Sequence, residues 1–231
     1  MLARLGFKAL ATTSSGFAFT LGRRDGNVTL DEVIAHTAQL VEATELPVSV
    51  DLENGYGPAP DDAARAIART ASAGAVGGSV EDYDPSGELY SLEHAAERVA
   101  AAVEAAQSLD FPFMLTARAE NHIRGNPDLD DTIARLQAFE RVGADVLYAP
   151  GLGTVEEIRA LCAAVSKPVN VLARRTLTLR EIADAGAQRI SVGGALAWVA
   201  AGALISAAEA ILERGDFSVL AGGVDPDAWL A

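Results

Sequence analysis

The chain repeats one pattern of apolar and polar positions. A helical segment ends in Gly, and a short apolar or β-branched run follows, as in AGAVGGSVED from Ala73 and VGADVLYAP from Val142. Gly suits the position just after a helix, and a continuous apolar run is typical of a strand buried on both faces. The pattern predicts seven strands, near Lys8–Thr12, Val48–Leu52, Gly78–Glu81, Phe113–Arg118, Asp145–Tyr148, Val169–Leu172 and Arg189–Val192.

The segments between these runs carry helix start signals. Thr29, Thr154 and Thr178 each precede a Glu by three residues, which is the capping-box spacing. Alternating strands and helices without a break in composition predict parallel strands, right-handed crossovers and one domain over residues 1–231. A doubly wound open sheet is the competing fold, and it is disfavoured because no G-x-G-x-x-G follows the first strand.

Seven strands are one fewer than a closed eight-stranded (β/α) barrel needs. The chain opens on MLARLGF, which reads as the end of a helix with no strand before it. Two explanations stay open: the first strand lies upstream of Met1 in a longer protein, or the barrel is incomplete.

Composition and charge narrow the classes of function. Lys and Arg total 18 against 32 Asp and Glu, so the formal net charge is −14, which argues against a nucleic-acid surface. The single cysteine, Cys162, excludes an internal disulfide and is expected to be a buried thiol. No apolar stretch is expected to reach the length of a membrane span, and no secretion signal is evident at the start. A cytoplasmic protein without a membrane partner is therefore predicted.

Acidic residues gather where two neighbouring strands end. Asp51 and Glu53 are two residues apart in VSVDLENGYG, so alternation along a strand would send both into the barrel mouth. Glu81 ends the next strand, about one βα unit later. Clustered carboxylates repel one another, and a hard divalent cation relieves that repulsion. We predict a metal site at Asp51, Glu53 and Glu81; each alone is equally well explained as an acidic loop residue.

Other polar residues are predicted near the same mouth. Arg118 suits the binding of a substrate carboxylate or phosphonate, although an ion pair within the barrel is the plainer reading. The loop from Thr12 to Gly16 offers small residues whose backbone amides suit an anion. Asp25 reads locally as a turn residue, and His122 is the one histidine of three near the predicted site.

Taken together, these segments resemble a known superfamily. ATTSSGFAFTLGRRD, VDLENGYG, VEDY, TARAE and ISVGGAL, in this order, are similar to isocitrate lyase and phosphoenolpyruvate mutase. The resemblance implies an eight-stranded barrel whose last helix is exchanged between subunits of a homodimer or homotetramer. It also implies Mg²⁺, with Mn²⁺ as a substitute, bound through Asp51, Glu53 and Glu81. The further site residues that it implies are Ser14, Ser15, Gly16, Asp25, Arg118 and Asn170.

The sequence departs from the pattern of the superfamily after the E-D strand. The lyases carry a K-K-C-G-H loop there and the mutase a gating loop with lysine, whereas this chain has a short segment from Tyr83 to Ser91 without Cys or Lys. Tyr83, Tyr90 and His122 are the remaining candidates to move a proton. We predict a Mg²⁺-dependent lyase that cleaves a C–C bond in a small 2-oxo or 2-hydroxy acid through an enolate. The alternatives are P–C bond chemistry, a 2-oxo-acid-binding protein with little catalysis, and an inactive truncated barrel.

Overall fold

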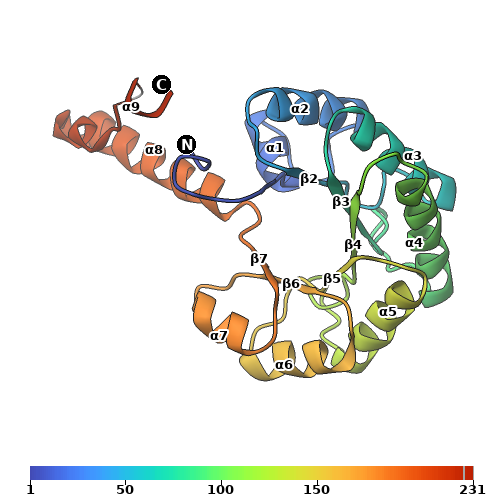
Figure 1. Ribbon diagram of the computed structural model, residues 1–231. Coiled ribbons are helices and arrows are strands. Elements are labelled where there is room, and N and C mark those ends of the chain that lie inside the picture. Colours follow the sequence, from blue (N-terminus) through green and yellow to red (C-terminus); the bar gives the residue numbers. More distant parts are fainter. Residues whose placement is uncertain (226, 231) are drawn as a thin grey trace.

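The computed structural model describes residues 1–225 and 227–230, and its centre is a sheet of seven parallel strands. Each strand pairs with its neighbour in the sequence, so the order around the sheet is β1 to β7. The sheet curls into a nearly closed barrel (Figure 1). The strands are β1 (Leu10–Ala11), β2 (Val48–Asp51), β3 (Gly77–Glu81), β4 (Met114–Arg118), β5 (Val146–Tyr148), β6 (Val169–Leu172) and β7 (Arg189–Ser191).

Helices follow these strands, and most of them surround the barrel (Figure 1). They are α1 (Ser14–Thr20), α2 (Leu30–Glu42), α3 (Pro60–Ser72), α4 (Leu92–Gln107), α5 (Leu129–Arg141), α6 (Val155–Ala164), α7 (Leu179–Asp184), α8 (Ala195–Arg214) and α9 (Asp227–Leu230), with a 3₁₀ turn η1 (Ser218–Gly222). All seven predicted strands are confirmed, as are the capping boxes at Thr29, Thr154 and Thr178. The described residues contribute no eighth strand.

The core lies between the sheet and the ring of helices. Val50, Leu115 and Leu147 of the central strands are almost completely buried, and Ile67 and Phe139 cover them from α3 and α5. Strands that are buried on both faces explain why the sequence shows continuous apolar runs rather than alternation. This packed core fixes the strand ends, from which the polar side chains of the mouth project.

The segment after β1 is a helix rather than the loop expected from its sequence. Ser14, Ser15 and Gly16 form the first turn of α1, and Thr13 precedes them in an extended conformation. Small polar residues are as typical of a helix start as of a loop, which is why the sequence pattern was ambiguous.

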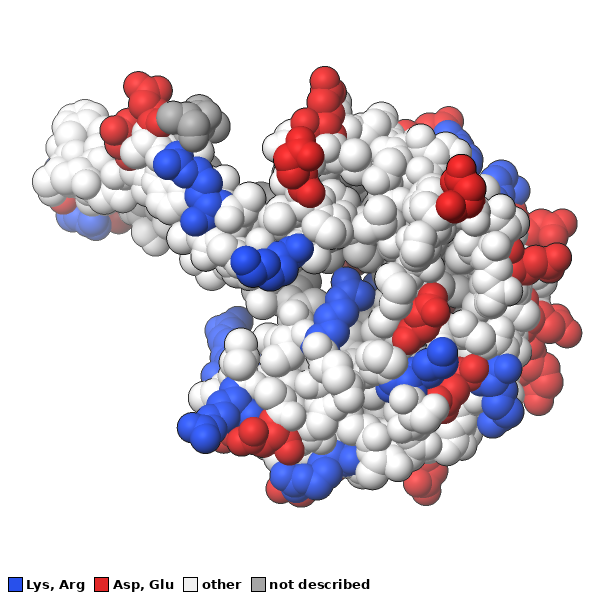
Figure 2. All heavy atoms as spheres, in the orientation of Figure 1, with Lys and Arg blue, Asp and Glu red and all other residues white. Residues whose placement is uncertain are grey.

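Helix α8 projects from the barrel as an arm with very little contact to it (Figure 1). It has 20 residues with mean hydropathy 1.9, and only 6% of its apolar window is buried. This helix is long and apolar enough to span a membrane by length and composition only, so the prediction that no stretch reaches that length is wrong. Most of the visible surface of the arm belongs to uncharged residues (Figure 2).

Candidate active site

Asp51 occupies the end of β2 and ties the segment after β1 to it. Its carboxylate accepts a hydrogen bond from the backbone N–H of Ser14 at 3.0 Å, and its own N–H donates to Oγ1 of Thr12 at 2.9 Å. One of the backbone amides predicted to bind an anion is therefore already paired with Asp51. The arrangement holds the Asp51 carboxylate at the mouth of the barrel, beside α1.

Glu53 reaches the same place by a different geometry from the one predicted. β2 ends at Asp51, and Glu53 has a left-handed backbone with φ of 48°, as does Tyr56 with φ of 63°. Strand alternation therefore does not apply to Glu53. A tight turn brings it next to Asp51 instead, and its N–H donates to Oδ1 of Asp51 at 3.4 Å. Non-glycine residues in this conformation are uncommon and cluster at functional sites.

Negative charge accumulates around Glu53, which forms no ion pair within the described part of the chain. Burial, and then the nearby carboxylates of Asp25 and Asp51, raise the pKa of Glu53 to about 7. The hydroxyl of Tyr56 donates to Oε1 of Glu53 at 3.4 Å, which offsets part of this cost. Asp25 therefore lies close enough to Glu53, at the mouth of the barrel, for its charge to raise the pKa of that carboxyl.

The turn that carries Glu53 is clamped from behind by Arg98 of α4. This guanidinium is buried and donates to the backbone carbonyls of Asn54, Gly57 and Ala59. It lies 4.5 Å from the ring centroid of Tyr90 and has no carboxylate among its hydrogen-bond partners in the described residues. A buried arginine without an acidic partner is rare, so its role here is to hold the turn in place.

Arg118, at the end of β4, connects the carboxylates of three strands. Its Nη1 lies 2.8 Å from Asp51, its Nη2 lies 3.0 Å from Glu81, and its Nε and Nη2 lie 3.0 and 2.9 Å from Glu120. Burial alone would lower the pKa of Arg118, but these three carboxylates raise it well above its usual value. The structure thus brings Asp51, Glu81 and Arg118 together, as predicted.

Glu120 was expected only as an alternative ion-pair partner of Arg118, which the structure shows it to be, and Asp82 was not predicted as part of this network. The N–H of Glu120 donates to Asp82 at 2.8 Å, and Asp82 lies 3.1 Å from Arg135 of α5. Burial raises the pKa of Asp82 to about 6. Arg124 also joins the network, with nitrogens 3.4 Å from both Glu81 and Glu120. The T-A-R-A-E pattern puts Glu120 on the face of Arg118, but nothing local marks Arg124.

The other predicted residues lie at different distances from this network. Tyr83 follows β3, and the guanidinium of Arg124 lies 3.8 Å from the centroid of its ring. His122 instead bonds Oγ1 of Thr132 at 2.9 Å through Nδ1. Asn170 is buried and donates to Oγ of Ser191 at 3.1 Å. Within the described residues, neither His122 nor Asn170 forms a hydrogen bond with the carboxylates of this network.

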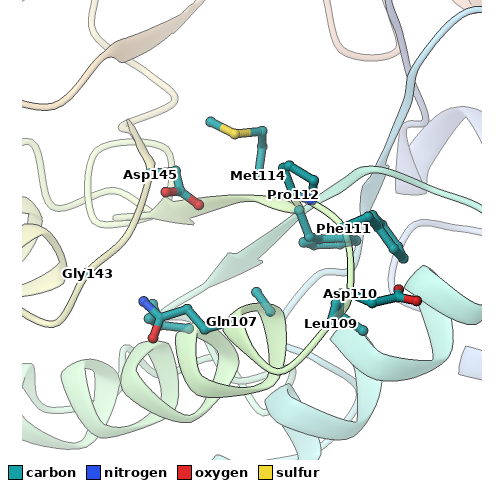
Figure 3. Close-up of a pocket in the computed structure, with 11 residues that line it drawn as sticks. Gln107, Leu109, Asp110, Phe111, Pro112, Met114, Gly143 and Asp145 are labelled. Carbon is teal, nitrogen blue, oxygen red and sulfur yellow. The ribbon is translucent and has the colours of Figure 1, made fainter.

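Two cavities differ in their relation to this site. The larger, of about 420 Å³, lies between the end of α4 and the start of β4, at the end of the barrel opposite the mouth (Figure 3). The smaller, of about 340 Å³, is lined by Glu53, Asn54 and Tyr56 together with Asp84. Active sites of barrels lie at the carboxyl ends of the strands, so the smaller cavity marks the functional end.

The carboxylate oxygens at the mouth are donors of the kind that bind a divalent cation. Within residues 1–225 and 227–230, no three carboxylates, imidazoles or thiols already stand in the positions of metal ligands. However, Asp25 and Glu53 form no ion pair among these residues and lie near the Asp51 carboxylate, and oxygen donors of this kind suit Mg²⁺. Glu81 is balanced by Arg118 and Arg124.

The fold and the site define a (β/α) barrel with an acidic, arginine-bridged mouth, a class of architecture whose active sites lie at the carboxyl ends of the strands. A family model described as phosphoenolpyruvate phosphomutase matches residues 1–212. The chain belongs to this family, within the isocitrate lyase and phosphoenolpyruvate mutase superfamily.

Individual relatives agree with this assignment. The 2-methylisocitrate lyase of Escherichia coli is 30% identical over 72% of this chain and 58% of its own length. The oxaloacetate decarboxylase of Bradyrhizobium diazoefficiens is 31% identical over 62% of this chain and 50% of its own length. A crystal structure of a lyase/mutase from Burkholderia cenocepacia is 49% identical with a TM-score of 0.96, over all of this chain and 85% of that one. The chain thus spans 50 to 58% of these curated relatives.

Proposed function

We propose that this chain is a Mg²⁺-dependent lyase that cleaves or forms a C–C bond in a small 2-oxo or 2-hydroxy acid. The observation that carries the proposal is the mouth of the barrel, where Asp51 lies beside Glu53 and 2.8 Å from Arg118. The lyase and decarboxylase among its relatives support this class of reaction. A cytoplasmic enzyme that works as one domain is part of the same proposal.

Asp51, Glu53 and Glu81, with Asp25 beside them, would hold the cation. Members of the superfamily are Mg²⁺-dependent, and Mn²⁺ accepts the same oxygen donors. When bound, the ion supplies Lewis-acid stabilisation of the charge that develops on an enolate. The residues of the chain then have separate tasks: Arg118 orients Asp51 and Glu81, and Tyr56 orients Glu53.

Among the three candidates for proton transfer, Tyr83 has the fewest competing contacts. The Tyr90 hydroxyl donates to Asp84 at 2.8 Å and accepts from Asn54, and His122 bonds Thr132. The hydroxyl of Tyr83 makes no hydrogen bond within the described part of the chain. We therefore assign the proton step to Tyr83, with Ser14, Ser15, Gly16 and Asn170 as the substrate-binding residues that the resemblance implies.

Turnover is expected only in the presence of the divalent ion. We expect the purified chain with MgCl₂ to release pyruvate from oxaloacetate or 2-methylisocitrate, and EDTA to abolish this release. A coupled lactate dehydrogenase assay measures pyruvate, and phosphonopyruvate in a parallel reaction tests the P–C alternative. Binding heat without turnover across the panel would favour a binding protein, and neither binding nor turnover would contradict the proposal.

The arm α8 would pack against a second copy of this chain. Its exposed side chains include Val199, Leu204 and Ile205, and such a continuous apolar surface is costly in water. The superfamily resemblance implies exchange of this helix between subunits, which gives the arm a partner barrel. Three charged residues near its end, Glu209, Glu213 and Arg214, would remain at the rim of such an interface.

Leu204→Glu is expected to shift the protein from a dimer or tetramer to a monomer. Leu204 is 72% exposed in the single chain, so the substitution leaves the barrel intact but places a charge in the interface. Size-exclusion chromatography with light scattering measures the change. Leu179→Glu on α7, where the side chain is 74% exposed, is the control and should leave the assembly unchanged. A wild-type chain that is monomeric, or that sediments with membranes, would overturn this proposal.

A further inference from the structure

We infer that Arg124 recognises a second acidic group of the substrate and so selects dicarboxylic 2-oxo acids over monocarboxylic ones. The inference rests on the proposed function and assigns a new role within the same site. Arg124 lies in the turn between β4 and α5, where its N–H donates to the carbonyl of Glu120 at 3.0 Å. This places its side chain over the mouth, next to Arg118.

Arg118 has little capacity left for a substrate. Its guanidinium offers five N–H donors. Nε and Nη2 contact Glu120, Nη2 also contacts Glu81, and Nη1 contacts Asp51, all at 3.0 Å or less. Its side chain is only 13% exposed. The main work of Arg118 is therefore to hold protein carboxylates, which leaves the recognition of a further anion to another residue.

Arg124 has the capacity that Arg118 lacks. Its side chain is 37% exposed, and its contacts to Glu81 and Glu120 are both 3.4 Å, longer than the 2.7–2.9 Å or so of a charge-assisted hydrogen bond. Its Nη1 has no hydrogen-bond partner among residues 1–225 and 227–230. These contacts anchor one edge of the guanidinium loosely and leave donors available to an incoming carboxylate.

Tyr83 supports the guanidinium of Arg124 on one face. The central carbon of the guanidinium lies 3.8 Å from the ring centroid, which is a close cation–π contact. This contact supports the guanidinium but uses none of its N–H groups. A planar guanidinium with free N–H groups on one edge can donate two parallel hydrogen bonds to a carboxylate, whereas a lysine cannot.

The position of Arg124 matches a substrate that has two acidic ends. Arg118 and Arg124 contact the same two carboxylates, Glu81 and Glu120, so both guanidinium groups belong to one cluster beside Asp51. If the cation proposed at Asp51 and Glu53 holds the first carboxylate of a 2-oxo acid, the second carboxylate could reach this cluster. A monocarboxylic acid would gain nothing from Arg124.

The affinities of Arg124→Gln for two probes test the inference. Titration calorimetry with MgCl₂ present measures the Kd of the full chain for 2-oxoglutarate, which has two carboxylates, and for pyruvate, which has one. We expect Arg124→Gln to weaken the affinity for 2-oxoglutarate by about tenfold or more, because a charge-assisted bidentate contact is lost. The affinity for pyruvate should fall by less than about twofold. Arg124→Lys should recover only part of the loss, because the charge returns without the fork.

Arg65→Gln is the matched control. Arg65 lies on α3 and forms a surface ion pair with Asp62 at 2.6 Å, so its loss removes a guanidinium that, within the described residues, pairs with none of the carboxylates around Arg118. We expect both affinities of this variant to equal those of the wild type. Thermal unfolding of all variants shows whether Arg124 has a structural role.

The outcomes separate the inference from the function on which it rests. Equal weakening of both acids in Arg124→Gln, or no weakening of either, overturns the role of Arg124 while the proposed function stands. A wild-type chain that binds neither acid in the presence of Mg²⁺ overturns the proposed function, and the inference fails with it.

Discussion

Asp51→Asn is expected to reduce Mg²⁺-dependent turnover by about a hundredfold or more, because the substitution removes a carboxylate aimed at the charge-bearing centre of the site. The side chain keeps its size, so the fold should remain. Asp51 accepts from Ser14 on one oxygen and pairs with Arg118 on the other, and an amide can serve only one of these donors. The binding of Mg²⁺, followed by calorimetry, should weaken in parallel with turnover.

Asp145→Asn is the control for this variant. Asp145 accepts from the N–H of Leu115 at 2.9 Å and lines the cavity at the opposite end of the barrel (Figure 3). Its substitution should affect stability but leave the affinity for Mg²⁺ unchanged. Full activity in Asp51→Asn, or an equal loss in both variants, would contradict the metal site at the mouth.

Gly55→Ala is expected to lower the free energy of unfolding by about 2 kcal/mol or more, and to reduce turnover as well. Gly55 has a φ of 80°, which L-residues rarely adopt, and a Cβ there would lie 2.9 Å from Cα of Ala63 in α3. The turn cannot easily move away, since Arg98 holds the carbonyls on both sides of Gly55. Any shift that relieves the contact also displaces Glu53.

Gly22→Ala separates the cost of the left-handed backbone from the cost of the steric contact with Ala63. Gly22 has a φ of 68°, but a Cβ at this position meets no atom within 4 Å. The control therefore carries the backbone cost of about 1–2 kcal/mol without the steric one, and turnover should be unaffected. Urea unfolding followed by circular dichroism gives both values. Equal destabilisation in the two variants would show that the contact with Ala63 is unimportant.

The strands and helix starts could be predicted because their signals are local. The apolar run before Asp51 and the Thr29 to Glu32 spacing each depend on neighbours in the sequence, and the structure confirms both. The exposure of α8 is expected only from the superfamily resemblance, which implies an exchanged last helix; its local pattern does not show it, since an apolar helix reads the same whether it packs on its own barrel or on another. Only the arrangement of the barrel shows that its apolar faces are left uncovered.

The sequence predicts several residues of the site but not which of their side chains contact one another. Asp51, Glu81 and Arg118 come from strand ends, and the parallel register brings strand ends together. Glu53 reached the site through a left-handed turn, a backbone state that residue type does not specify for glutamate. Arg124 is visible only in three dimensions, because its partners Glu81 and Tyr83 lie about forty residues away in the sequence.

The contacts of Arg98 determine how the backbone around Glu53 responds to pH. A guanidinium keeps its proton near neutrality, and its acceptors here are backbone carbonyls, which do not titrate. The frame around Glu53 therefore keeps its shape as that carboxyl gains or loses a proton near pH 7. A change in behaviour across neutrality would report the charges carried by buried carboxyl groups at the mouth, Glu53 and Asp82 among them, and not a rearranged backbone.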